Sequence, residues 1–428
     1  MSVFTNRIVA LIIFLITIIG IIYIIKTTKK EKNILHTHTK KLNIILIILS
    51  FILFISSLII NLINIDKYSI KNIIDSIFNS ISIGLIPLPI TTSIIYYIFD
   101  CSKNEYYHIK TIISNEDIPK SLYNKLRKAH INLIIVSEKN PSIEIKELKK
   151  EQLNRNIIKT KSFFINSKDY NSILDLFSNK DEVIYSTNVS STYKEIIDSR
   201  GNEDNYIRTI KYLISSHLPL ILSVLLFWFT SFPFTSNLLL IVTIKIYTLI
   251  TSLFVYKNMP FDSDIKLRYP KPSKVFLPSQ ELLLNVIQSF LVFFVLTIPY
   301  MYILTLGGSE KFVTTIYLIT FIYANIFLTY VNYSESSMLK NIFVSLKNIK
   351  LDIMVLVSIA FTIIINYIHI FNTTNIGIRN YFGCVLFAFI GTIIFDITKF
   401  ARFITIRGDK KHETKNHKKH RRSKLNNS

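Results

Sequence analysis

Two residue types that build compact sites are scarce in this chain of 428 residues, which holds only two cysteines and nine glycines. Cys101 and Cys384 lie in different regions of the sequence. Neither a disulfide framework nor a cysteine-based metal site is therefore expected. The shortage of glycine leaves little room for glycine-rich loops that bind phosphate groups.

Apolar sequence, in contrast, is abundant, because half of the residues are hydrophobic and the mean hydropathy is positive. Apolar runs of about 18 or more residues are long enough to cross a bilayer. The first run has only Arg7 before it and a lysine cluster after it, which favours an uncleaved membrane anchor. We count nine spans, at residues 8–25, 43–64, 75–99, 210–230, 237–256, 283–305, 313–332, 352–371 and 381–398.

The formal net charge of +22 is concentrated beside these spans. Lysines and arginines gather in residues 26–42 and in the tail from Lys399, whereas residues 100–206 are nearly balanced. Basic residues flanking membrane helices mark the cytoplasmic side and favour anionic headgroups as partners, rather than nucleic acid. We therefore expect an integral membrane protein with its N-terminus outside and its C-terminus in the cytoplasm.

The spans and charges divide the chain into four parts. The predicted fold is a polytopic α-helical membrane protein of about nine helices with one small cytoplasmic α/β insert. The parts are three N-terminal spans with a basic loop at 26–42 (1–99), the insert (100–209), a six-helix bundle (210–398) and a basic cytoplasmic tail without a fixed fold (399–428).

Ile86-Pro87-Leu88-Pro89 lies inside the third predicted span. It resembles the I-P-E-G-L-P motif of P-type cation-transporting ATPases without the Glu and Gly. A proline pair frees backbone carbonyls in a membrane helix, so the helix is expected to unwind here, although a plain kink is the alternative. Residues 260–270 follow the family's Pro-x-Asp-x-Asp-Ile pattern. The basic loop 26–42 is too short for the actuator domain found at that place in the family.

The insert resembles the haloacid-dehalogenase-like phosphorylation domain of that family. Residues 118–126 read as an amphipathic helix, and residues 129–140 as a buried strand and loop. Residues 182–197 read as a further strand, loop and helix. Alternating strands and helices predict a small parallel, Rossmann-like sheet.

The motifs that perform phosphoryl transfer in the family are absent. The sequence contains neither D-K-T-G-T nor the T-G-D-G-x-N-D magnesium loop, and no nucleotide-binding domain is inserted. Asp100 lacks the neighbouring Thr and Gly, and Lys194 falls at the lysine that the family uses near the phosphate. These two residues form a weak candidate phosphate site. ATP and Mg²⁺ would be the family's cofactors, but the missing nucleophile and metal loop argue against an enzyme with bound cofactors.

The candidate transport site is equally altered. Alignment of Ser215-Ser216-His217 with the family's S-S-N-x-G-E places His217 at the Asn and Leu220 at the Glu. Lys245 and Thr248 align with an Asn and a Thr of the next helix. No metal ligands or catalytic residues are predicted. The resulting relic transport site is Pro87, Pro89, His217, Lys245 and Thr248.

More ordinary roles for these residues stay open. His217 also suits helix packing, and Lys245 also suits a side chain that reaches to the membrane surface or bonds to unwound carbonyls. Asn285, Gln288, Asn325 and Asn366 suit hydrogen bonds between helices.

The resemblance implies a truncated, catalytically degenerate relative of these pumps that acts as a scaffold, as a regulator of another membrane transporter or as a passive pathway. A transporter of a cation or a lipid-like solute, energised by a partner, is the first alternative. An unrelated polytopic membrane protein is the second.

Overall fold

The structure is a computed structural model, and it describes twelve stretches of the chain. The predicted span 8–25, Pro89, Asp100 and the tail 399–428 lie outside the described residues. The described stretches are 34–63, 70–88, 106–114, 118–135, 183–186, 188–230, 238–262, 264–269, 279–334, 337–346, 348–368 and 373–396.

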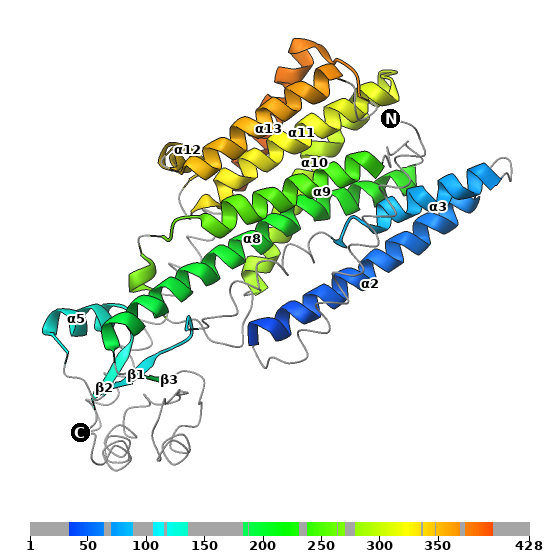
Figure 1. The fold of residues 1–428 in the computed structure, drawn as a ribbon. Coiled ribbons are helices and arrows are strands. Elements are labelled where there is room, and N and C mark those ends of the chain that lie inside the picture. Colours follow the sequence, from blue (N-terminus) through cyan, green and yellow to red (C-terminus); the bar gives the residue numbers. More distant parts are fainter. Residues whose placement is uncertain are drawn as a thin grey trace, which may run out of the picture.

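Helices dominate the described part of the chain (Figure 1). Six of them are long and apolar enough to cross a membrane. They coincide with six of the nine predicted spans. The labelled helices are α2 (Ile34–Ile63), α3 (Ile70–Gly84), α5 (Lys120–Lys128), α8 (Val189–Thr230), α9 (Leu238–Ile250), α10 (Ser279–Thr305), α11 (Glu310–Tyr333), α12 (Met338–Ser345) and α13 (Ile349–Ile368). The last described helix is Gly377–Asp396.

The six membrane-spanning candidates differ in how much of each is covered by protein. In α11, 89% of the most apolar window is buried, against 28% in α2 and 28% in the last helix. A helix that is apolar all round and buried belongs in the centre of a bundle, whereas half-exposed apolar helices face lipid. In Figure 1, α8, α9 and α10 lie between the α2–α3 pair and the layer that contains α11 and α13.

The other two predicted spans within the described residues are irregular. α3 ends at Gly84, and the backbone of residues 85–87 forms turns before the described stretch ends at Leu88. α9 covers only Leu238–Ile250 and continues as a π-helical turn, Thr251–Val255, and a 3-10 turn, Tyr256–Asn258. Nine spans are therefore not confirmed, since the described residues contain six helices of membrane-crossing length and apolarity.

The insert contains a parallel three-stranded sheet in the order β2-β1-β3. The strands are β1 (Thr111–Ser114), β2 (Asn132–Ile135) and β3 (Val183–Tyr185), and Ile112 pairs with Leu133 on one side and Ile184 on the other. The helix–strand order predicted for residues 118–140 is confirmed by α5 and β2. The strand–loop–helix order predicted for residues 182–197 is confirmed by β3 and α8.

The sheet is connected directly to the membrane bundle through α8. Val189 and Ile196 of its first turns lie in the same buried cluster as Ile112 and Ile184 of the sheet. Its second half, including Leu213 and Leu220, lies in the buried cluster of the membrane bundle. The predicted domain boundary at 209/210 thus falls inside one continuous helix.

Candidate functional site

The centre of α8 holds a buried polar site inside the membrane bundle. His217 Nδ1 lies 3.0 Å from the Leu213 carbonyl oxygen, and its Nε2 lies 3.4 Å from Thr248 Oγ1 on α9. Because a carbonyl oxygen only accepts, Nδ1 donates the proton and Nε2 faces Thr248. Both side chains are buried. The structure thus brings together two of the residues that the sequence predicted for the relic transport site.

Two neighbouring serines join α8 to further helices. Ser215 Oγ donates to Asn285 Oδ1 of α10 at 2.7 Å, and Ser216 Oγ donates to Asn325 Oδ1 of α11 at 2.6 Å. The predicted role of these asparagines in bonding between helices is confirmed. Such bonds are characteristic of polar side chains in membrane bundles, where water is not available as a partner.

Pro87 lies at the irregular end of α3. The Ile86 amide donates to the Ile83 carbonyl at 3.0 Å, and the Leu88 amide donates to the Leu85 carbonyl at 3.2 Å, so the regular helical bonding is lost here. Pro87 is buried, and α3 packs against α9. The predicted break in this helix is confirmed up to Leu88, while Pro89 lies outside the described residues.

The remaining candidates of the transport site contribute no acidic group. Leu220, aligned with the family's Glu, is a buried hydrophobic residue. The backbone of Lys245 lies in α9, and the structure does not describe its side chain. The sequence contains no Asp or Glu between Asp204 and Asp262. The described polar contacts around His217 come from hydroxyl, amide and imidazole groups of α8, α9, α10 and α11, and no carboxylate takes part in them.

The carboxyl edge of the sheet is where a parallel α/β sheet usually binds ligands. Ser186 and Thr192 hydroxyls lie 2.5 Å apart, and the Asn188 side chain accepts from the Ser191 amide at 3.1 Å, which caps α8. Lys194 is exposed in the second turn of α8. Asp100 lies outside the described residues, so the structure does not bring the two weak phosphate candidates together.

These described groups at the carboxyl edge are a poor fit to Mg-ATP. The hydroxyls and the amide of Ser186, Asn188 and Thr192 are neutral, and they already bond to one another or to the backbone of α8. Magnesium prefers carboxylate oxygens together with phosphate oxygens. We therefore derive no step through ATP or magnesium.

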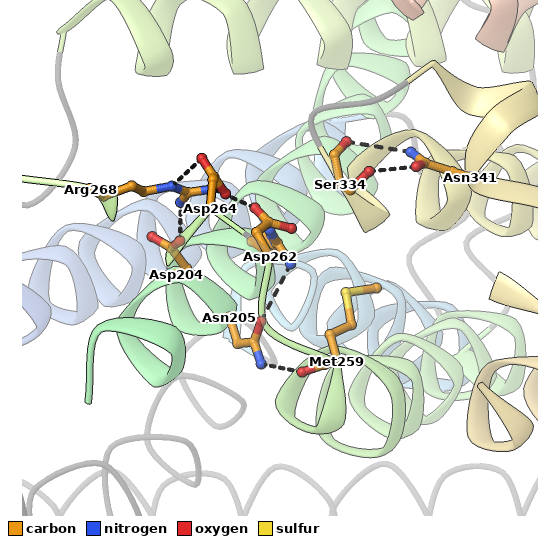
Figure 2. A network of polar contacts seen from close by, with 9 residues as sticks. Asp204, Asn205, Met259, Asp262, Asp264, Arg268, Ser334 and Asn341 are labelled. Atoms are coloured by element: carbon orange, nitrogen blue, oxygen red, sulfur yellow. Dashed lines mark hydrogen bonds and ion pairs between the residues drawn. The ribbon is translucent and has the colours of Figure 1, made fainter. Parts of the chain in front are cut away.

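A dense ionic cluster lies where α8 leaves the insert (Figure 2). The segment of residues 259–262 and 264–269, called the junction loop below, supplies Asp262, Asp264 and Arg268. Arg268 forms ion pairs with Asp264 at 2.7 Å, with Asp262 at 2.6 Å and with Asp204 of α8. Arg208 of α8 also pairs with Asp262, at 2.5 Å.

The ion pairs shift the pKa values of Asp264 and Arg268. Hydrogen bonds from Arg268 lower the pKa of the Asp264 carboxyl, although partial burial opposes the change. Burial by itself lowers the pKa of Arg268, but the hydrogen bond with Asp264 and the nearby Asp204 raise it above the usual arginine value. The paired charges hold the junction loop against α8.

Arg200 connects the junction loop to the sheet. Its Nη1 donates to the carbonyl oxygens of Ala129 at 3.0 Å and Arg268 at 3.1 Å, and its Nη2 donates to the Ile109 carbonyl at 3.4 Å. The side chain is buried. One guanidinium thus joins the insert, α8 and the junction loop.

Sequence reasoning missed this junction. The Pro-x-Asp-x-Asp-Ile pattern indicated the loop, but it did not identify Arg200 or the pairing of Arg268 with Asp204. A usable signal was the spacing of Arg200 behind Ile196 and Ile197, because a charge near the apolar face of a helix requires buried partners.

The fold defines an integral, polytopic α-helical membrane protein with a small insert that contains a parallel three-stranded sheet. Residues 231–401 match the family model described as "Cation transporting ATPase, C-terminus". This match supports membership of the P-type cation-transporting ATPase family through the C-terminal region. The match covers less than half of the chain. No curated protein matches it.

Proposed function

We propose that this protein is a catalytically degenerate member of the P-type cation-transporting ATPase family that acts without ATP hydrolysis, as a scaffold or regulator of another membrane transporter or as a passive pathway. The observation that supports this most directly is the polar site at His217, whose described contacts include no carboxylate. An ion stripped of water needs opposite charge or several oxygen ligands, and an uncompensated charge in a low-dielectric interior is costly.

The hydrogen bonds at this site support the same proposal. Ser215, Ser216 and Thr248 use their hydroxyl groups on neighbouring side chains or on their own helix backbone. A buried leucine stands at the position that aligns with the family's Glu. Such an arrangement favours a fixed bundle over a site that alternately binds and releases a cation.

The insert is consistent with the same proposal. We interpret its parallel sheet as the remnant of a haloacid-dehalogenase-like, Rossmann-like phosphorylation domain. The sequence lacks the nucleophile and magnesium motifs of that domain. A sheet of this type joined rigidly to α8 can still serve as a docking platform for a partner protein.

A phosphoenzyme assay tests the proposal. The purified full-length chain, incubated with γ-labelled Mg-ATP and quenched in acid, is expected to retain no more label than the Asp100→Asn variant. Label that survives acid in the wild type and disappears in Asp100→Asn would show a working nucleophile and refute the proposal. Calorimetry with Mg-ATP on the same two preparations separates binding from turnover.

One observation favours a transporter as the second candidate function. Asn285 Nδ2 is buried and has no hydrogen-bond partner among the described residues. A buried amide of this kind is commonly bonded to water or to a polar solute. Unchanged solute flux into vesicles carrying the His217→Ala or Lys245→Ala variant would count against this candidate.

A further inference from the structure

The short helix α12 joins α11 to α13. Both neighbours are long and apolar enough to cross a membrane, so the segment between them lies at a membrane surface. In Figure 1, α12 lies at the end of the bundle that also carries the sheet. This places α12 on the side of the insert.

One face of α12 is fixed firmly to the bundle. Met338, Asn341 and Ser345 are buried. Asn341 Nδ2 donates to the Tyr330 carbonyl of α11 at 2.9 Å, and the Met338 amide donates to Asp396 Oδ2 of the last helix at 2.5 Å. The contacts with two spanning helices determine which side chains α12 turns outward.

The outward face is apolar. Leu339 and Phe343 of α12, and Leu346 directly after its last residue, are spaced at i, i+4 and i+7 and are 54%, 73% and 66% exposed. Residues at this spacing form one stripe on a helix. Three large exposed apolar side chains in one stripe indicate a surface that meets something other than water.

The stripe continues into the lipid-facing side of α13. Ile349 at the start of α13 is 71% exposed, and Ile353 and Leu356 follow it at 47% and 67%. A spanning helix must place such residues against acyl chains. Because the exposed Leu346 and Ile349 bring the apolar faces of α12 and α13 close together along the chain, lipid is the occupant that the geometry favours.

Among the described residues, two lysines border this surface. Lys340 of α12 and Lys350 of α13 are both exposed, and Lys350 Nζ lies 5.9 Å from the ring centre of Phe254. A lysine next to an apolar stripe places its aliphatic stem along the hydrocarbon and its charge among the phosphates.

We propose that α12 is a membrane-surface helix that embeds the Leu339–Phe343–Leu346 stripe at the boundary between headgroups and acyl chains, with Lys340 and Lys350 on anionic phosphates. This goes beyond the proposed function, because it assigns a lipid-binding surface that is independent of any transport or phosphate site. The helix would fix the depth of the α11–α13 pair in the bilayer.

A single-tryptophan reporter tests the proposal. The chain has one tryptophan, Trp228, so Trp228→Phe with Phe343→Trp leaves a single reporter on α12. The full-length protein is reconstituted into phosphatidylcholine vesicles with and without phosphatidylserine. We expect blue-shifted emission, strong quenching by lipids brominated near the headgroup, and stronger quenching when phosphatidylserine is present.

Matched variants define the other outcomes. Tyr123→Trp, which lies 50% exposed on α5, is the water-exposed control in the same background, and Leu346→Trp replaces Phe343→Trp if that variant does not fold. The same emission and quenching as the α5 control would overturn the proposal. Protection from both brominated lipid and aqueous quencher would overturn it as well, because a protein would then cover the stripe.

The lysines are tested in the same system. Replacing Lys340 and Lys350 by glutamine is expected to remove the extra quenching that phosphatidylserine causes, while quenching in phosphatidylcholine persists. If phosphatidylserine acts equally on the lysine variant and its parent, the assignment of these two lysines to anionic headgroups is wrong.

Discussion

At the scale of single residues, the junction between insert and membrane depends on side chains that satisfy buried backbone groups. Arg200 bonds to three carbonyl oxygens of segments that are distant in sequence. Gly201, its neighbour, leaves space for the ring of Phe261 in the junction loop. Arg200 supplies the hydrogen bonds, and Gly201 allows Phe261 to lie close to the same turn of α8.

Removing the Arg200 guanidinium should lower the free energy of unfolding substantially. Arg200→Met loses hydrogen bonds from a charged donor and leaves buried carbonyls unsatisfied, at an expected cost of about 2–4 kcal/mol in the free energy of unfolding. Pulse proteolysis of the detergent-solubilised chain across a urea series measures it. The control is Lys194→Met, an equal loss of charge on an exposed residue of the same helix. Equal urea midpoints for the two variants would contradict the role of Arg200.

Adding a methyl group at Gly201 should destabilise the protein, while the same change at Gly383 should not. A Cβ at Gly201 would lie 2.3 Å from Phe261 Cδ1, whereas nothing lies within 4 Å of a Cβ at Gly383. We expect Gly201→Ala to cost about 1–3 kcal/mol through overpacking. Gly383→Ala should be neutral or slightly stabilising, because alanine favours helix.

Both changes are measured as shifts in melting temperature. In a Cys101→Ser background, a thiol-reactive dye reports unfolding when the buried Cys384 becomes accessible. The double variant Gly201→Ala with Phe261→Ala should cost less than the sum of its single changes. If the cost of the double variant equals the sum of the two single costs, Gly201 and Phe261 are not in contact.

At the scale of elements, the junction loop fixes the direction in which α8 leaves the sheet. Ile265 lies in the buried cluster of the insert, while Met259 lies in that of the membrane bundle. Asn205 of α8 donates to the Met259 carbonyl at 2.8 Å. The junction loop therefore joins the insert to the end of the α9 segment.

The pH dependence of the loop follows from the lowered pKa of Asp264. A depressed carboxyl pKa adds stability above the unfolded value of about 4, and that stability is lost as the pH falls through the folded value. Because the Asp264 side chain is 58% exposed, we expect only a few tenths of a kcal/mol. The difference in urea midpoint between wild type and Asp264→Asn should shrink from pH 7 to pH 3. A difference that grows on acidification would contradict the pairing.

At the scale of the whole molecule, the insert, α12 and the start of α10 lie at one end of the bundle, and the turn between α10 and α11 lies at the other (Figure 1). The positive-inside pattern assigns the first end to the cytoplasm. The orientation in the membrane is a prediction from charge, because a helix bundle by itself has no inside or outside.

Cysteine labelling tests this orientation. In a Cys101→Ser, Cys384→Ser background, Tyr123→Cys on α5 and Leu306→Cys after α10 place single thiols at exposed positions on the two ends. In sealed right-side-out cells, a membrane-impermeant maleimide should label Leu306→Cys and spare Tyr123→Cys, and lysis should make both reactive. The opposite pattern would reverse the predicted topology.

The sequence by itself determined the features that depend on local composition. Six of the predicted apolar spans coincide with helices long and apolar enough to cross a membrane, and the alternation of short strands and helices gave the order of α5, β2, β3 and α8. The proline at Pro87 gave the break in its helix. Each of these rests on a property of a short segment, which periodicity and backbone chemistry report directly.

The tertiary structure alone decided which distant groups meet. Ser216 and Asn325 are separated by 109 positions, and Arg200 and Arg268 by 68. The sequence placed His217 and Thr248 at one site only through a family alignment, and nothing in it placed Arg200 beside the carbonyls of the sheet. The local sequence around a polar side chain does not show which distant group it will bond to. Their partners are set by how helices pack, because a buried donor must reach the acceptor that the fold brings to it.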